Sequence, residues 1–188
     1  MLSHKGTQTI ETQRLILRQI GRQDAQVLFE NCFSHPAVTR YLSYETHKDI
    51  NDTYEIIDKW VSAYKRDKNY HWVITLRQDG MPIGTVTCMD IDESASCGKL
   101  GYQLSENMWG NGYMSEALSA IIEYLFNEVG FNRLEAMHIV GNSASGRVLR
   151  RCRMQYEGMC RQKVFCSGSY KDVNMYAILK SDYRGGAI

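Results

Sequence analysis

The chain has 188 residues, of which 44% are hydrophobic and 23% are charged, and its formal net charge at pH 7 is +1. This length fits one domain with a full hydrophobic core, and the composition is that of an ordinary globular protein. So small a net charge argues against a general nucleic-acid binder and against a polyanionic partner held by bulk charge. We therefore expect a single domain over residues 1–188, with a core from about 9 to 183, and no nucleic-acid partner.

The first residues carry no apolar segment typical of a secretory signal, and no run approaches the ~20 apolar residues that span a bilayer. The six cysteines form no Cys-x-x-Cys pair and no regular spacing. This pattern favours free thiols in a reducing compartment over a disulfide framework. We expect a cytoplasmic protein without a membrane partner and without a metal site.

The first half of the chain predicts early helices followed by a block of strands. Branched residues favour strands, apolar residues at spacings of three and four favour a helix, and Asp79-Gly80 between two apolar runs favours a hairpin turn. The expected elements are a strand at 14–18, a helix at 24–29, a helix at 52–65 capped by Asn51 or Asp52, and strands at 70–76 and 83–90.

The second half alternates strands and helices. The expected elements are a strand at 99–104, an amphipathic helix at 112–129 that Gly130 ends, a strand at 133–140, a helix at 143–151, and strands at 156–165 and 173–179. A helical crossover joins the strands at 99–104 and 133–140, so these two strands should be parallel neighbours. The predicted fold class is α+β, with a mixed, mostly antiparallel sheet of roughly six to seven strands flanked by about four helices.

The most informative stretch joins the strand that ends at Leu104 to the long helix. Gly110 and Gly112 let the backbone turn tightly and approach a ligand closely. The first N–H groups of a helix have no intrahelical partner and lie at the positive end of its dipole, so such a turn can hold a pyrophosphate. A plain strand-to-helix loop is the alternative. The turn is not a dinucleotide fingerprint, because Ser115 stands where the third glycine is needed, and it lacks the Gly-Lys-Ser/Thr of a Walker loop.

Four segments together resemble one enzyme family. Gly101-Tyr102-Gln103-Leu104 with Trp109 to Ala117 resembles the acetyl-CoA motif of the GNAT acetyltransferases, and more narrowly of the RimJ/RimL branch that acetylates ribosomal-protein N-termini. The other three segments are Thr12 to Arg18, Asn142 to Ser145 with Val148-Leu149, and Tyr156-Glu157-Gly158 with Gly168 to Val173. The resemblance spans about Thr9 to Tyr183. It implies the GNAT fold and transfer of an acetyl group from acetyl-CoA to an amine by direct attack on the thioester.

The resemblance assigns acetyl-CoA, as co-substrate, to two parts of the chain. The strand before the turn would pair with the pantetheine arm through Gln103 and Leu104, whose N–H groups can also polarise the thioester carbonyl. Asn142 would hydrogen-bond the pantetheine region or serve only as a helix cap. The family often has Gln or Arg where this chain has Asn107, which weakens one side-chain contact only. Backbone amides of the turn would bind the pyrophosphate, here those of Met108, Trp109, Gly110, Asn111, Gly112, Tyr113 and Met114.

The resemblance also implies a catalytic serine but leaves the base open. Ser145 would lie near the sulfur and protonate the leaving thiolate, with a capping hydroxyl as the alternative. Other family members use a tyrosine further along this helix, where Cys152 stands here. The family's carboxylate before the Gly-Tyr strand is replaced by Lys99, and the RimL-type base position falls on Val164. Candidates for the base, each also explained as a structural or solvated residue, are Glu157 at a family motif position, Glu106, His71 and His138.

The acceptor is inferred only from the family. Tyr41 and Tyr44 lie near the wall of its acceptor pocket, so we expect them to bind the substrate. The RimJ/RimL likeness favours a protein N-terminal α-amine, of ribosomal-protein type. The alternatives are a polyamine, amino acid or aminoglycoside, and a non-catalytic acyl-CoA-binding module. The protein is expected to be a monomer or a homodimer. Acidic residues that would attract a polyamine, but equally fit a solvated helix face, are Asp49, Asp52, Glu55 and Asp58.

Overall fold

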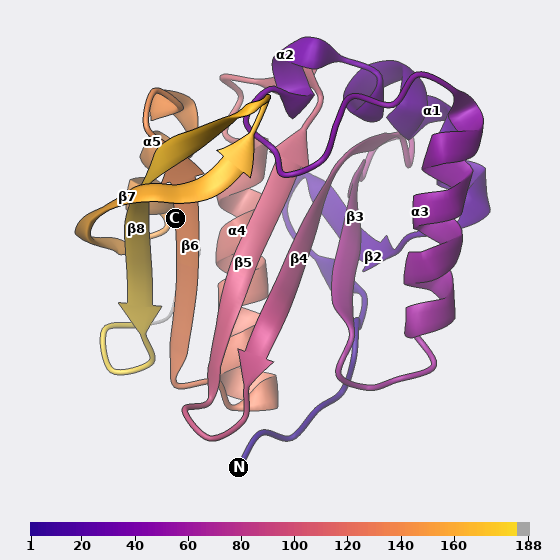
Figure 1. Cartoon of the computed structure of the whole chain (residues 1–188). Coiled ribbons are helices and arrows are strands. Elements are labelled where there is room, and N and C mark those ends of the chain that lie inside the picture. Colours follow the sequence, from indigo (N-terminus) through magenta and orange to yellow (C-terminus); the bar gives the residue numbers. More distant parts are fainter. Residues whose placement is uncertain (184–188) are drawn as a thin grey trace.

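The computed structural model describes residues 1–183, and its centre is one mixed sheet in the order β1-β2-β3-β4-β5-β6-β8-β7 (Figure 1). Every pair of neighbours is antiparallel except β5 and β6, which are parallel, as their helical crossover predicts. The described strands number eight, against the six to seven expected, because the two-residue β1 has no strand pattern in the sequence. They are β1 (Ile10–Glu11), β2 (Leu15–Gln19), β3 (Tyr70–Leu76), β4 (Pro82–Asp92), β5 (Cys97–Leu104), β6 (Arg133–Ile139), β7 (Gln155–Cys166) and β8 (Ser169–Leu179).

The helices depart from expectation mainly before residue 64. The expected helix at 24–29 is the 3-10 turn η1 (Arg22–Asp24), α1 (Ala25–Leu28) and the π-helical η2 (Phe29–Phe33), and the short α2 (Pro36–Thr39) was not predicted. The prediction that Asn51 or Asp52 caps α3 (Ile50–Ala63) is wrong. Asp49 is the cap, because its Oδ1 accepts the N–H of Asn51 at 2.7 Å, and Asp52 completes the capping box.

The later helices agree closely with the sequence pattern. α4 (Tyr113–Tyr124) continues as the π-helical η4 (Leu125–Val129) and ends at Gly130, whose φ of 92° is left-handed. α5 (Ser143–Arg151) follows β6, and a 3-10 turn, η3 (Glu106–Met108), precedes the glycine turn. No helix within residues 1–183 is long and apolar enough to cross a membrane.

Helices cover the sheet on two sides, and strand alternation assigns each side chain to one of them. Trp72 and Ile74 of β3 share a core with Leu118 of α4, which runs behind the sheet in Figure 1; we call this side the α4 face. Val73, between them, packs with Leu28 and Ile57 of α1 and α3 on the opposite side, which we call the α3 face.

The strands β5 and β6 pair over only part of their length. Their register runs from Cys97 opposite Arg133 to Leu100 opposite Ala136. Beyond that point β5 follows β4 up to Leu104, and β6 follows β8. An opening between the two strands therefore lies at the end where β5 meets the glycine turn, and it connects the α4 face with the α3 face.

Candidate active site

The glycine turn between β5 and α4 presents a row of backbone N–H groups. Gly110 and Gly112 both have a φ of 80°, a left-handed conformation that costs other residues about 1–2 kcal/mol. The first hydrogen bond of α4 runs from Glu116 N to Gly112 O at 3.1 Å. No hydrogen bond within residues 1–183 engages the N–H groups of residues 110–115. They are left for an anionic ligand at the positive end of the helix dipole.

The start of the chain braces this turn. Arg14 donates from Nε to Glu116 Oε2 at 2.7 Å and from Nη1 to the Asn111 carbonyl at 2.9 Å. Its guanidinium lies 4.5 Å from the centre of the Tyr113 ring, and Thr12 Oγ1 donates to Glu116 Oε1 at 2.6 Å. Burial opposes ionisation of Glu116, but the hydrogen bonds from Thr12 and Arg14 outweigh it and lower its pKa. Hydrogen bonds and a ring contact thus join two segments that lie far apart in the sequence.

The edge of β5 offers further backbone donors to the opening. Ser105 N donates to Ile83 O on β4 at 2.8 Å. Because alternate residues of a strand direct their N–H groups to the same side, the N–H of Gln103 also faces β4, whereas that of Leu104 faces the opening. Of the two residues expected to polarise a thioester carbonyl, only Leu104 therefore has its N–H on the required side. Trp109 Nε1 donates to the Leu104 carbonyl at 2.8 Å and ties the turn to the strand.

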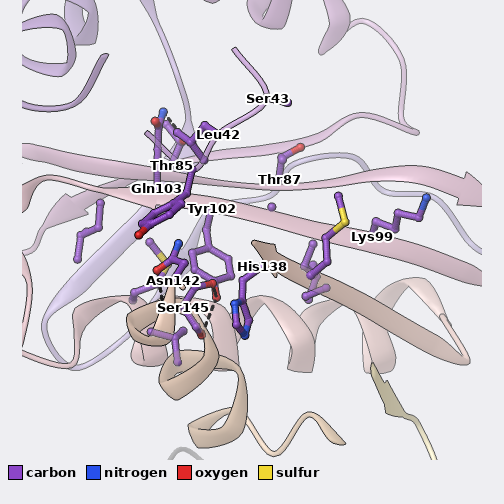
Figure 2. A pocket seen from close by; sticks show the side chains of 18 of the residues that line it. Leu42, Ser43, Thr85, Thr87, Lys99, Tyr102, Gln103, His138, Asn142 and Ser145 are labelled. Atoms are coloured by element: carbon purple, nitrogen blue, oxygen red, sulfur yellow. Dashed lines mark hydrogen bonds between the residues drawn. The ribbon is translucent and has the colours of Figure 1, made fainter. Parts of the chain in front are cut away.

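Ser145 lies at the first turn of α5 and contacts β5. Asn142 caps this helix, because its Oδ1 accepts the N–H of Ser145 at 3.2 Å. The Ser145 hydroxyl is 2.7 Å from the Tyr102 hydroxyl, which is also 3.2 Å from the Ser145 carbonyl oxygen. Figure 2 shows this hydrogen bond, with Asn142 and His138 beside it. Burial raises the pKa of Tyr102, so its hydroxyl stays protonated and available as a donor.

A cavity of about 1280 Å³ joins these groups to the α3 face. The tip of the β7–β8 hairpin meets the loop after α2, where Cys166 Sγ donates to the Leu42 carbonyl at 3.1 Å (Figure 1). Asn111 does not line the cavity, because its amide folds back to the Trp109 carbonyl at 3.1 Å. The sequence-predicted residues that do line it are Tyr41, Tyr44, Gln103, Leu104, Met108, Trp109, Gly110, Gly112, Tyr113, Met114, Asn142 and Ser145.

The side chain of Gln103 belongs to the α3 face rather than to the glycine turn. Its Oε1 accepts a hydrogen bond from the Tyr44 hydroxyl, and its Nε2 donates to Thr85 Oγ1 at 3.3 Å. Burial raises the pKa of Tyr44, which therefore stays protonated. This chain of polar contacts links the loop after α2 to the floor of the cavity.

Two of the four candidate bases lie outside the cavity lining. Glu157 pairs with Arg133 through both carboxylate oxygens, one of them 2.9 Å from Nη1, and this pairing lowers the pKa of Glu157. Arg133 begins β6, whereas the opening lies toward the other end of that strand. The structure does not bring Glu157 to the cavity lining, because its carboxylate is the ion-pair partner of Arg133. Glu106 also lies outside the lining.

The two histidines line the cavity and are held by different contacts. His71 stacks on Trp60 with ring centres 3.8 Å apart, and burial lowers its pKa to about 3. His138 Nδ1 hydrogen-bonds the Ile139 carbonyl at 2.9 Å. Its Nε2 packs on Gly146 so closely that a Cβ there would lie 2.8 Å away. Among the residues described, no carboxylate hydrogen-bonds Ser145, and the lowered pKa of His71 makes that histidine a weak base.

Some site residues have no signal in the sequence. Tyr102 belongs to a sequence motif that indicates no role for its hydroxyl, and its contact with Ser145 joins residues 43 positions apart. Arg14 belongs to the opening motif, but nothing in that motif indicates that it braces the glycine turn. Strand alternation alone placed neither, because both contacts depend on how β2, β5 and α5 pack in three dimensions.

Comparison with known proteins gives consistent matches. Residues 14–155 match the family model for the acetyltransferase (GNAT) domain. The chain is 34% identical over 171 residues to the uncharacterized N-acetyltransferase YoaA of Bacillus subtilis, covering 91% of this chain and 96% of that protein. It is 28% identical over 126 residues to the ribosomal-protein-serine acetyltransferase of Escherichia coli, covering 67% and 69%. A structure of RimL, a ribosomal L7/L12 α-N-protein acetyltransferase in complex with coenzyme A, has a TM-score of 0.83 at 23% identity, covering 94% and 100%, and shares the fold.

Proposed function

The chain belongs to the GNAT family of acetyl-CoA-dependent N-acetyltransferases, and on that premise we propose that its acceptor is the α-amine of a protein N-terminus. The observation that carries the proposal is the juxtaposition of two features. The unpartnered N–H groups of residues 110–115 fit a pyrophosphate, and the opening beside Leu104 leads from them to a separate cavity half on the α3 face.

The residues of the donor half fit acetyl-CoA without any charged side chain in the turn itself. The amides of residues 110–115 bind the pyrophosphate, and Leu104 N–H donates to the thioester carbonyl. Arg14 and Glu116 hold the turn in this conformation. Bound acetyl-CoA supplies an activated thioester, whose carbonyl carbon forms the new C–N bond while its C–S bond breaks.

Tyr102 and Ser145 serve the leaving group. Tyr102 and Ser145 share a hydrogen bond between their hydroxyls, and in the proposed arrangement Tyr102 donates to Ser145 Oγ, which leaves the Ser145 proton directed at the sulfur. A hydrogen bond from Ser145 stabilises the thiolate as it forms, and the proton lost by the amine leaves through solvent.

Two observations support an α-amine over other amines. An α-amine has a pKa near ~8 and is partly neutral at cell pH, whereas a lysine amine near ~10.4 needs a strong base, and the lowered pKa of His71 makes that histidine a weak one. Each carboxylate of the lining has a cationic partner, so none is left to hold a polyamine. Asp90 pairs with Lys99, Glu93 with His4 and Lys68, and Glu135 with Arg133.

The names of relatives supply further support. The matched protein of Escherichia coli acts on a ribosomal-protein serine by its name. A second, 30% identical over 87 residues, is the ribosomal protein uS5-alanine N-acetyltransferase of the same organism.

The acidic series from Asp49 to Asp58 lies outside the cavity lining, which weakens the polyamine alternative.

Thiol release from acetyl-CoA tests the proposal with three acceptors. These are a peptide with a free N-terminus, the same peptide N-terminally blocked but carrying a lysine, and spermidine. We expect turnover with the free N-terminus alone. Faster turnover with spermidine or with the blocked peptide would overturn the assignment of the acceptor.

A further inference from the structure

The α3 face of the cavity carries an apolar surface that the proposed function does not yet use. Met89 of β4 and Met137 of β6 are 45% and 43% exposed, although most large apolar side chains of the chain are buried. Met175 of β8 is partly buried and lines the same cavity. Exposed apolar side chains that gather in a cavity mark a place where a ligand covers them.

Sheet register places these methionines around Gly101. Thr87 is opposite Gly101, and Met137 is opposite Met175. Because Leu100 pairs with Ala136, Gly101 and Met137 lie at the same level, on the two sides of the opening. A Cβ on Gly101 would lie 3.1 Å from Met89 Cε, so the missing side chain leaves a trough that Met89 borders.

The trough adjoins the reaction centre. Gly101 immediately precedes Tyr102, whose hydroxyl contacts Ser145 on the α4 face. An amine that reaches the opening from the α3 face therefore leaves the group attached to it over Gly101. Charges begin at the level of Met89, whose cross-strand partner Lys99 pairs with Asp90 at 3.2 Å, and Glu135 beside Lys99 pairs with Arg133 at 2.8 Å, so each of these charges is already neutralised. The trough itself is apolar apart from the Thr87 hydroxyl, which donates to the Tyr70 carbonyl at 3.0 Å.

We propose that Met89, Met137 and Met175 form the subsite for the first side chain of the acceptor, and that this side chain is apolar. The proposal rests on the proposed function, since it needs a peptide whose α-amine enters the opening. Methionine side chains are flexible and polarizable, so they adapt to apolar groups of different shape. A charged first residue would lose its hydration here without finding an unpaired counter-ion.

Two peptides that differ only in their first residue, Leu or Ser, test the subsite. We expect kcat/KM for the Leu peptide to exceed that for the Ser peptide by about tenfold in the wild-type protein. Met137→Gln and Met175→Gln keep the side-chain length but add an amide, and each should bring this ratio close to one. Both peptides are measured on the same preparation, so a partly unfolded variant lowers both rates and leaves the ratio unchanged.

Met159→Gln is the matched control, because Met159 is 51% exposed on β7 but does not line the cavity. It should keep the wild-type ratio. Equal rates for the peptides in the wild-type protein, or a ratio that persists in Met137→Gln and Met175→Gln, would overturn the subsite while α-amine acetylation stands. If no peptide is acetylated and a small amine is, the proposed function fails together with the subsite.

Discussion

Under the proposed function, the two halves of the cavity recognise their ligands by different means. On the donor side the groups are backbone amides of residues 110–115 and of Leu104, held in place by two left-handed glycines. On the acceptor side they are side chains from β4, β6 and β8, with Tyr44 from a loop. Backbone recognition tolerates changes of side chain but depends on conformation, whereas side-chain recognition depends on residue identity. The donor half should therefore be sensitive to backbone strain, and the acceptor half to single substitutions.

Removing the leaving-group hydrogen bond should have the largest effect. Ser145→Ala should lower kcat by about 100-fold, the lower range for a positioned proton donor, and should barely change the Kd for CoA. Tyr102→Phe should lower kcat in the same direction because it frees the Ser145 hydroxyl to rotate. Stopped-flow rates and CoA titrations measure the two quantities.

A double variant that combines Ser145→Ala and Tyr102→Phe shows whether the two residues share one role or act independently. If Tyr102 acts through Ser145, adding Tyr102→Phe to Ser145→Ala should lower kcat no further. Ser143→Ala is the control, because this hydroxyl is on the same helix but outside the cavity lining. If the two substitutions lower kcat by fully multiplicative factors, the proposal that Tyr102 acts through Ser145 is contradicted.

Strain in the glycine turn should weaken donor binding by about tenfold. Gly110→Ala places a Cβ on a residue with a φ of 80°, at a cost of about 1–2 kcal/mol unless the turn changes shape. Either outcome misplaces the amides, so the Kd for acetyl-CoA rises. Gly80→Ala is a matched control in the β3–β4 turn, since Gly80 has a φ of 73° and, like Gly110, leaves a Cβ free of contacts within 4 Å. Equal effects of the two variants on the Kd for acetyl-CoA would refute the proposal that the amides of the glycine turn bind the pyrophosphate.

Loss of the Arg14 contacts that hold the glycine turn should weaken acetyl-CoA binding by a smaller factor. Arg14→Ala removes two hydrogen bonds and the contact with Tyr113, and we expect the KM for acetyl-CoA to rise about fivefold, equivalent to about 1 kcal/mol. Arg22→Ala is the control. Arg22 also pairs with a carboxylate, that of Asp58, and lies 4.7 Å over the Tyr54 ring, but it is remote from the turn. An unchanged KM in Arg14→Ala would show that the turn holds its shape unaided.

The pH dependence tests whether the acceptor side contains a base. His71 has a pKa of about 3, so it is neutral throughout the working range, and kcat/KM should rise with pH near the amine's own value of about 8. His71→Gln should leave that rise where it is. A rise centred near pH 6 that disappears in the variant would identify His71 as a base.

The lowered pKa of His71 also predicts how the free energy of unfolding depends on pH. The unfolded chain protonates this histidine near pH ~6.5, so its depressed folded pKa makes the free energy of unfolding fall as pH drops below that value. The slope is at most about 1.4 kcal/mol per pH unit. His71→Gln should flatten it in urea titrations, whereas His35→Gln, at an exposed position, should not.

The sequence predicts best what is local. The GNAT family, the α+β class and the parallel β5–β6 pair are confirmed, because each depends on motifs or on a crossover within a few dozen residues. The early region was predicted worst, since a π-helix and a four-residue helix carry no clear period. The sequence does not identify Asp49 as the cap because three acidic or amide residues, Asp49, Asn51 and Asp52, stand within four positions at the start of α3.

Site residues follow the same rule. Motifs point to the turn and to Ser145, and all of these residues except Asn111 line one cavity. Glu157 also matched a motif position, but a motif does not state at which end of the sheet a side chain lies, and Arg133 engages it there. Gln103 lies in the predicted strand, yet only the pairing with β4 shows that its N–H faces away from the opening. Met89, Met137 and Met175 come together through the register of separate strands, which no sequence pattern revealed.

Amide chemical shifts measured while CoA is titrated into the isotope-labelled protein test the central claim most directly. We predict that the largest changes occur at the N–H groups of residues 110–115 and at Leu104, with little change at Met137 or Met175. Large shifts confined to the methionine-lined face, with the amides of the glycine turn unchanged, would contradict the claim that backbone amides bind CoA.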